Sequence, residues 1–172
     1  MKKLNIEIKA KTDSPQKIRD VLNSEKAEFL GIDYQIDTYF KVNSGRLKLR
    51  EGNIENSLVH YNRENQKGPK QSDVTLFKTS KGSSLKDILL GSLGRLVVVD
   101  KQREIYFIDN VKFHIDKVKY LGDFIEIEAI DNNGDIGRDK LFQQCNYYID
   151  LFGINEEDLI SKSYSDLLLK RT

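Results

Sequence analysis

The sequence predicts an α+β protein in which antiparallel strands dominate and a few helices interrupt them. The first observation is an alternation of apolar and polar residues that recurs along most of the 172 residues and is typical of strands with one apolar face. The second is turn-forming sequence between the alternating segments, such as Asn43-Ser44-Gly45 and Asn132-Asn133-Gly134. The length and this order of elements favour one domain over residues 1–172.

The alternation predicts the strands in chain order. In the first, Leu4, Ile6, Ile8 and Ala10 alternate with Asn5, Glu7, Lys9 and Lys11. The others are predicted at Phe29–Tyr34, Asp37–Val42, Arg46–Arg50, Leu58–Glu64, Val74–Thr79, Leu96–Phe107, Val111–Val118 and Phe124–Ile130. The stretch Asn65–Ser72 contains Gly68-Pro69 and predicts a solvated loop, after which strand patterning resumes.

Helices are predicted where the apolar period changes. Asp13-Ser14-Pro15 provides a cap and a first-turn proline for a helix that extends to about Lys26. A second helix is predicted from Ser84 to about Leu93, and a third from about Arg138 to the stop at Gly153. Their buried positions are predicted as Ile18, Val21 and Leu22, then Leu85, Ile88 and Leu89, then Leu141, Cys145, Tyr148 and Phe152. Asn155 and Asp158 favour a short helix, and Ser163–Leu169 a helical or packed tail.

Composition excludes several classes of protein. The chain has 28 Lys and Arg against 27 Asp and Glu, a balance that argues against a basic coat for duplex DNA. No segment approaches the ~20 apolar residues of a membrane span, and Glu7 interrupts any signal-peptide core, so we expect a cytoplasmic protein. Because Cys145 is alone and the two histidines are far apart, a bound metal would have to be held by carboxylates.

Charged residues on the polar faces come in adjacent pairs of the same few kinds. The pairs are Glu7 and Lys9, Lys48 and Arg50, Lys101 and Arg103, and Glu126 and Glu128, with single charges at Arg63, Lys78 and Asp116. Each pair could simply face water on a one-sided sheet. However, Lys101 and Arg103 share a face with Val97, Val99 and Ile105, and a closed sheet with a charged interior would need such a change. Neighbouring carboxylates suit Mg²⁺ or Mn²⁺, and Arg and Lys bind phosphate oxygens.

The order of motifs resembles a known family. Asn5-Ile6-Glu7-Ile8-Lys9 is similar to the Glu-x-Glu-x-Lys signature that opens CYTH domains, the triphosphate tunnel metalloenzyme superfamily of class IV adenylyl cyclases, thiamine triphosphatases and inorganic triphosphatases. The resemblance continues through Asp37–Phe40, Leu47–Glu51, Asp100–Phe107, His114–Asp116, Leu121–Glu128 and Ser163–Leu168. Its late part is most similar to the class IV adenylyl cyclase branch.

The resemblance implies a tunnel of eight antiparallel strands that binds a triphosphate centrally and divalent metal at its acidic side. It implies metal ligation by Glu7, Asp116, Glu126 and Glu128, and phosphate binding by Lys9, Lys48, Arg50, Arg63, Lys78, Lys101 and Arg103. Glu7, Lys9, Arg103 and Glu126 would be the catalytic residues. One position departs from the family motif, because Asn5 stands where the first Glu belongs and brings no charge to a metal.

Three activities agree with these residues. The first is a cyclase-like phosphorus–oxygen lyase that converts ATP to cyclic AMP and pyrophosphate with Mg²⁺ or Mn²⁺. The second is a hydrolase of thiamine triphosphate or inorganic tripolyphosphate, and the third is a non-catalytic binder of nucleotides or polyphosphate. We expect a nucleoside triphosphate or another triphosphate as the ligand, and neither duplex nucleic acid nor a membrane as a partner. The sequence leaves open whether the chain forms a homodimer.

Overall fold

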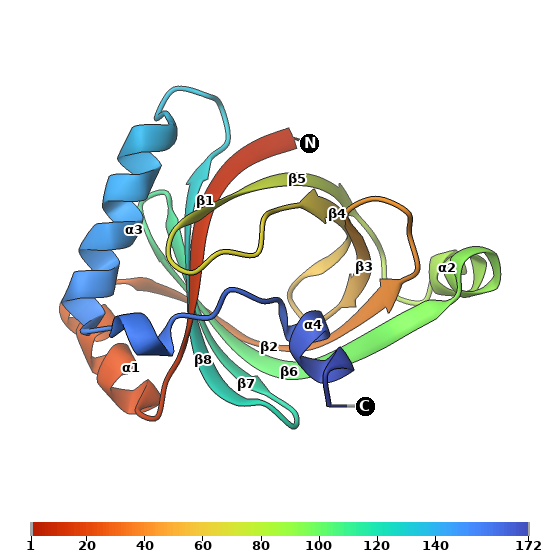
Figure 1. The fold of residues 1–172 in the computed structure, drawn as a ribbon, viewed down its shortest axis with the longest axis horizontal. Helices are drawn as coiled ribbons and strands as arrows, with labels where there is room; N and C mark the ends of the chain where they lie inside the picture. Colours follow the sequence, from red (N-terminus) through yellow and green to blue (C-terminus); the bar gives the residue numbers. More distant parts are fainter. Residues whose placement is uncertain (1, 172) are drawn as a thin grey trace.

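The strands close into a barrel in the order β1-β5-β4-β3-β2-β6-β7-β8, with every neighbouring pair antiparallel. The structure, a computed structural model, describes residues 2–171. Their eight strands are β1 (Lys2–Lys11), β2 (Glu28–Phe40), β3 (Arg46–Glu51), β4 (Asn56–Asn62), β5 (Lys70–Lys78), β6 (Arg95–Ile108), β7 (Val111–Val118) and β8 (Gly122–Asp131). In Figure 1 they form a ring. The predicted closed eight-stranded antiparallel barrel is confirmed.

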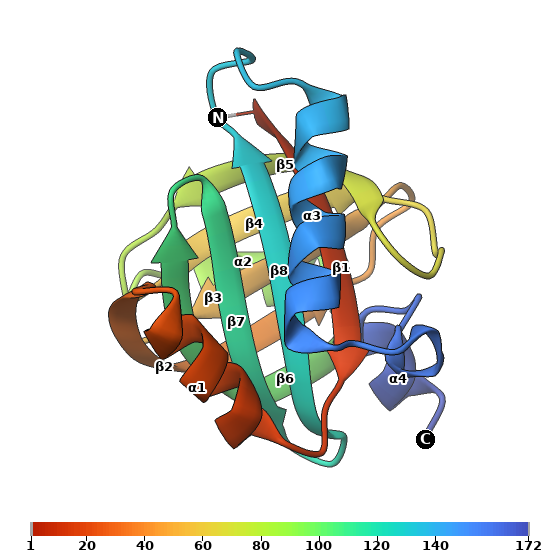
Figure 2. The ribbon, with the colours of Figure 1, turned by 90° about the vertical axis from the view of Figure 1, so that its left-hand side faces the viewer.

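The helices lie outside this ring. They are α1 (Pro15–Ser24), α2 (Leu85–Leu93), α3 (Arg138–Phe152) and α4 (Tyr164–Leu169), with a 3₁₀ turn at Glu156–Asp158. Figure 2 shows α3 lying along β1 and β8, with α1 crossing in front of β7. Helix α4 lies apart from them, near the C-terminus.

The main hydrophobic core lies between the outer face of the barrel and two helices. Ile6 and Ile8 of β1 project outward and are buried together with Leu22 of α1 and with Leu141 and Cys145 of α3. The predicted burial of Leu141, Cys145, Tyr148 and Phe152 is confirmed. Because residues alternate across a strand, this outward core directs Asn5, Glu7 and Lys9 to the inside. The apolar half of each strand therefore stabilises the fold and leaves the inner half for charged groups.

A smaller apolar cluster lies toward one end of the interior. It contains Val99 of β6 and Phe124 of β8, which share their strand faces with Lys101 and Glu126. The inner face of β6 thus changes from apolar to basic along its length, as its sequence predicts. The other buried members are Tyr39, Val59, Tyr61, Val118 and Tyr164.

Several strand boundaries differ from the predicted ones, and β4, predicted at Leu58–Glu64, spans Asn56–Asn62. The predicted strands Phe29–Tyr34 and Asp37–Val42 merge into the single strand β2, which ends at Phe40, because Tyr34 and Gln35 continue the pairing with β6. The register shifts instead between Phe29 and Gly31 and again between Tyr39 and Phe40. Strand β5 begins at Lys70, inside the predicted loop Asn65–Ser72, because Lys70–Ser72 pairs with β1 despite its polar sequence.

Two helix predictions were also wrong in detail. None of the described residues Leu85–Leu93 of α2 is buried, and Ile88, a predicted core position, is 61% exposed because α2 projects beside β2 and β6. Helix α1 ends at Ser24, and the Ser14 side chain makes no capping hydrogen bond. No helix in residues 2–171 combines the length and apolar character required to cross a bilayer.

Candidate functional site

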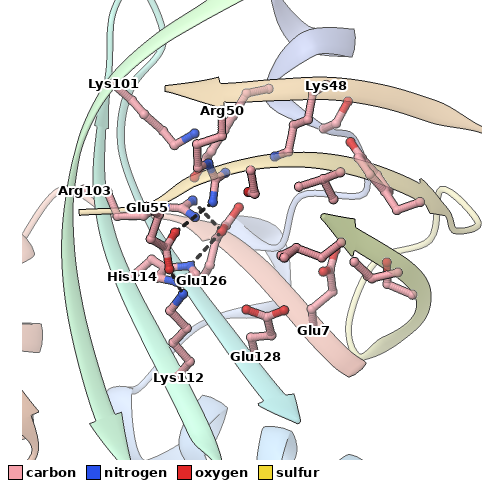
Figure 3. A pocket seen from close by; sticks show the side chains of 18 of the residues that line it. Glu7, Lys48, Arg50, Glu55, Lys101, Arg103, Lys112, His114, Glu126 and Glu128 are labelled. Carbon is pink, nitrogen blue, oxygen red and sulfur yellow. Dashed lines mark hydrogen bonds and ion pairs between the residues drawn. The ribbon is translucent and has the colours of Figure 1, made fainter. Parts of the chain in front are cut away.

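The barrel encloses a cavity of about 440 Å³ whose lining is charged on several strands. Figure 3 shows acidic and basic side chains converging in it from different strands. The structure brings the following predicted site residues to this lining: Glu7, Lys9, Lys48, Arg50, Arg63, Lys78, Lys101, Arg103, Glu126 and Glu128. Lys78 is exposed where β5 ends.

The acidic side is built by the pairing of β1 with β8. The register places Glu7 opposite Glu128 and Lys9 opposite Glu126, so all four side chains share the inner face. Glu7 accepts from Arg63, and Glu128 accepts from the amide of Asn5. Two carboxylates, Glu7 and Glu128, therefore lie side by side within the enclosure.

Glu126 lies at the junction of the acidic and basic sides. One oxygen lies 3.0 Å from Lys9 Nζ, while the other lies 2.7 Å from Arg103 Nη2 and 3.1 Å from His114 Nδ1. Burial alone would raise the pKa of Glu126, but Lys9 and Arg103 lower it well below its ordinary value. Glu126 is therefore ionised at neutral pH despite its burial.

The basic side is organised by one buried carboxylate, Asp37 of β2. It accepts from Arg50 Nε and Nη2 at 2.9 Å each, from Lys48 Nζ at 3.0 Å and from Lys101 Nζ at 2.8 Å. Burial would raise the pKa of Asp37, but Arg50, Lys101 and Lys48 lower it well below the usual range. Burial also lowers the pKa of Lys101 to about 7. Three cations thus share one anion, and this excess of positive charge suits a bound polyanion.

Asp116 occupies a different place from the other predicted metal ligands. Its oxygens accept from Arg103 Nε at 2.6 Å and Nη2 at 2.5 Å, and from the Tyr164 hydroxyl at 2.7 Å. It is fully buried and lies behind Arg103, outside the cavity lining. The structure therefore places Asp116 as the partner of Arg103 and does not bring it beside Glu7 and Glu128.

Glu55 enters the cavity from the loop between β3 and β4. Asp33 holds this loop by accepting from the amides of Ile54 at 2.8 Å and Glu55 at 2.9 Å. A Cβ at Gly52 would lie 2.5 Å from Asp33 Oδ1, so the contact requires glycine there. The Glu55 carboxylate pairs with Arg50 at 3.0 Å and with Lys112. A carboxylate of the protein itself therefore pairs with two of the cations that line the cavity.

The C-terminal segment packs against β1 and β5 and reaches the cavity. The Ile160 amide donates to the Lys9 carbonyl at 2.8 Å, and Lys70 Nζ donates to the carbonyls of Ile160 and Ser161 at 3.3 and 3.2 Å. Tyr164, at the start of α4, reaches the cavity lining. Ser163 and Tyr164 therefore form part of the cavity wall, and covering of a tunnel mouth by the tail stays a prediction.

The acidic side has the donor chemistry for a hard divalent cation. Carboxylate oxygens of Glu7, Glu126 and Glu128 face one enclosure, and Asn5 Oδ1 is buried without a hydrogen-bond partner in the described part of the chain. Oxygen ligands of this kind suit Mg²⁺ and Mn²⁺. In residues 2–171 no three such ligands converge on one point, and each of these carboxylates is paired with a side chain of the protein. The residues present therefore fit such a metal, provided these pairs open.

The sequence did not identify several residues that line the cavity or support its lining. Lys112, His114 and Asp116 are alternate residues of β7 and lie on the same face of the strand, so the alternation could have identified Lys112. Asp37 lies within a recognised motif and shares an inner face with Tyr39, but nothing in the sequence marks it as the centre of three cations. Glu55 and Tyr164 come from a loop and a tail, where no periodicity indicates direction.

Comparison with known proteins agrees with this geometry. The model of the family described as CYTH domain matches residues 3–164. The chain belongs to the CYTH domain family. A curated relative from Methanocaldococcus jannaschii, named "Putative adenylate cyclase MJ0240", is 27% identical over 95% of this chain and 98% of its own.

Solved structures of other proteins have the same fold as this CYTH domain. The PH1012 protein from Pyrococcus horikoshii OT3 superposes with a TM-score of 0.74 at 26% identity, covering 95% of this chain and 98% of that one. A protein from Vibrio parahaemolyticus, described as a "putative adenylate cyclase", has a TM-score of 0.75 at 16% identity, covering 96% and 98% of the two chains. At 16% identity the likeness shows the fold alone.

Proposed function

We propose that this CYTH domain is a divalent-metal-dependent enzyme that acts on a triphosphate in its tunnel, with class IV adenylyl cyclase activity as the reaction. The observation that carries the proposal is the enclosure of a cationic group, centred on Asp37, and a carboxylate group, centred on Glu7 and Glu128, in one cavity. The M. jannaschii relative, by its name, supports the cyclase reaction.

In this proposal the basic side chains bind phosphate and the acidic side chains bind metal. Lys48, Arg50, Lys101 and Arg103 would bind the phosphate oxygens, with Lys9 and Arg63 joining them from the acidic side. Glu7, Glu126 and Glu128, with the Asn5 carbonyl, would hold Mg²⁺ or Mn²⁺, which supplies positive charge to the phosphate oxygens when bound. The assignment of Asp116 as a further ligand remains a prediction.

In the proposed reaction the ribose 3′-oxygen attacks the α-phosphorus and loses its proton to solvent. The bond between the α-phosphorus and the bridging oxygen breaks, and pyrophosphate leaves with the electron pair. The protein contributes position and charge compensation, so no covalent nucleophile is required. Arg103 is well suited to the phosphate role, because Asp116 engages its Nε and Nη2 edge and fixes the plane of the guanidinium.

Hydrolysis of a triphosphate is the second candidate, and Asn5 is the observation that favours it. This residue removes one carboxylate from the acidic side, which weakens charge compensation there and could favour a different nucleophile, water. A third outcome, binding without turnover, follows if the missing charge abolishes catalysis.

One set of assays separates the three. Purified protein is incubated with Mg²⁺ or Mn²⁺ and, in turn, ATP, thiamine triphosphate and tripolyphosphate, and cyclic AMP, pyrophosphate and phosphate are measured. Cyclic AMP and pyrophosphate in equal amounts are expected from ATP, and no product when EDTA removes the metal. Phosphate from tripolyphosphate without cyclic AMP from ATP would replace the cyclase with the hydrolase, and tight binding without product would support the binder.

Matched glutamate variants test the acidic side. Glu126→Ala is expected to abolish turnover, because it removes an anion shared by Lys9 and Arg103 inside the cavity. Glu104→Ala is the control, since Glu104 also pairs with an arginine, Arg19, but on the outer face of β6. Unchanged activity in Glu126→Ala would refute the assignment of the acidic side. A large gain in activity in Asn5→Glu would show that asparagine costs a metal ligand.

A further inference from the structure

Tyr164 is a buried tyrosine that reaches the cavity from outside the barrel sheet. It is the first residue of α4 and is 4% exposed. Phe124 of β8 packs against its ring edge to face, with 5.0 Å between the centroids. The ring therefore has a fixed orientation within the tunnel wall.

The two ends of this side chain contact two different ion pairs of the site. The hydroxyl donates to Asp116 Oδ2 at 2.7 Å, and the same oxygen accepts from Arg103. The Lys9 ammonium lies 3.8 Å from the centroid of the ring while it pairs with Glu126. Tyr164 thus contacts both Lys9 of β1 and the partner of Arg103 of β6, two cations that also share Glu126 of β8.

The start of α4 is held in place by several independent contacts. Ser163 and Asp166 form a reciprocal capping box, in which the Asp166 amide donates to Ser163 Oγ and the Ser163 amide donates to the Asp166 carboxylate. The same carboxylate pairs with Arg46 of β3 at 2.8 Å. These contacts fix the backbone at Tyr164 against the barrel, which a side chain with a positioning role requires.

We propose that Tyr164 is a positioning residue that presents Arg103 and Lys9 to the triphosphate, an inference that rests on the proposed function. Its hydroxyl shares the charge of Asp116, so that Asp116 orients Arg103 without fully neutralising it. Its ring covers one side of the Lys9 ammonium and leaves the N–H groups of Lys9 directed at Glu126 and the cavity. Tyr164 acts through these cations and does not itself bind the phosphates.

The experiment measures tripolyphosphate binding by calorimetry, without turnover. Tyr164→Phe removes the hydroxyl and keeps the ring, and the dissociation constant is expected to rise about tenfold, as for the loss of one hydrogen bond to a charged group. Tyr164→Leu also removes the ring over Lys9, and a further rise of about threefold is expected.

Tyr106→Phe is the matched control. Tyr106 is also a buried strand-packed tyrosine whose hydroxyl donates to a carboxylate, Glu104, at 3.0 Å, and that carboxylate also pairs with an arginine, Arg19. This set lies on the outer face of β6, so Tyr106→Phe is expected to leave the dissociation constant unchanged. Thermal unfolding of both variants identifies any loss that comes from stability.

A double-mutant cycle with Asp116→Asn distinguishes positioning from a general structural effect. If the hydroxyl acts through Asp116, adding Tyr164→Phe to Asp116→Asn causes little further loss of affinity, whereas independent effects would multiply. Equal binding by wild type and Tyr164→Phe would overturn the inference and leave the proposed function intact. Absence of binding by the wild type would overturn both. The comparison of Tyr164→Phe with Tyr106→Phe stands even if Asp116→Asn does not fold.

Discussion

Replacement of Asp37 by asparagine would leave three cations without their shared anion. In the native chain Asp37 is 1% exposed and accepts four hydrogen bonds from Arg50, Lys48 and Lys101, all between 2.8 and 3.0 Å. Removal of one partner from a buried ion pair costs about 3–5 kcal/mol. We expect the lower end, about 3 kcal/mol, because the asparagine carbonyl still accepts a hydrogen bond.

The assay is thermal and urea unfolding of wild type and Asp37→Asn at neutral pH. For a domain of this size, a loss of about 3 kcal/mol corresponds to a fall in Tm of roughly 6–12 °C. Asp100→Asn is the control, since Asp100 pairs with Lys119 at 3.7 Å and both side chains are at least half exposed. Such surface pairs contribute about 1 kcal/mol or less.

Added tripolyphosphate tests whether the cations around Asp37 form a phosphate site. A bound polyanion would supply the charge that Asp37→Asn lacks, so the same ligand concentration should raise the Tm of the variant more than that of the wild type. A loss of stability no larger than that of Asp100→Asn would refute the reasoning about the buried charges. An equal Tm increase in both proteins would refute the link between those charges and the ligand.

Three further predictions concern acid, the Glu55 carboxylate and the outer core. Burial alone would raise the pKa of Asp37, but its cations lower that pKa well below the usual range, so the stability it provides is complete above about pH 4 and is lost as the pH falls toward the folded-state pKa. In urea unfolding, the free energy of unfolding should therefore change less between pH 7 and pH 3 in Asp37→Asn than in the wild type. Glu55→Gln should strengthen tripolyphosphate binding about threefold in calorimetry, because Glu55 competes for Arg50 and Lys112; unchanged or weaker binding would show that Glu55 does not compete. Leu22→Ala should cost about 2–5 kcal/mol in urea unfolding and leave tripolyphosphate affinity unchanged, since Leu22 is buried outside the barrel; a parallel loss of affinity would contradict this separation.

The sequence predicts the barrel and the charged lining well where one physical rule decides the outcome. Strand alternation places Glu7 with Lys9, and Lys101 with Arg103, on one face of their strands, and the resemblance to CYTH domains implies that these faces line one tunnel. The change from Val99 to Lys101 on one face predicts a partly charged interior, and the structure has it.

The parts that the sequence did not predict depend on contacts between distant segments. Glu55 points inward because Asp33, on another strand, holds its loop. Asp116 turns to Arg103 because the two residues are opposite each other in the pairing of β6 with β7. Helix α2 has an apolar stripe, but none of the residues Leu85–Leu93 is buried against the barrel, and Ile88 remains exposed. The apolar periodicity of a segment predicts which of its faces is apolar, but it does not predict which other element packs against that face.

The placement of the main core outside the barrel has a consequence for how this fold can diversify. Ile6, Leu22 and Leu141 hold the wall from its outer side, so a substitution on the inner side removes no part of that packing. In the charged part of the interior, the balance of charge limits change, because a buried cation that loses its anion destabilises the fold. We therefore expect the ligand preference of such a tunnel to change through paired substitutions. In these, a cation and its anion are replaced together, by another charged pair or by a neutral pair, and the scaffold stays the same.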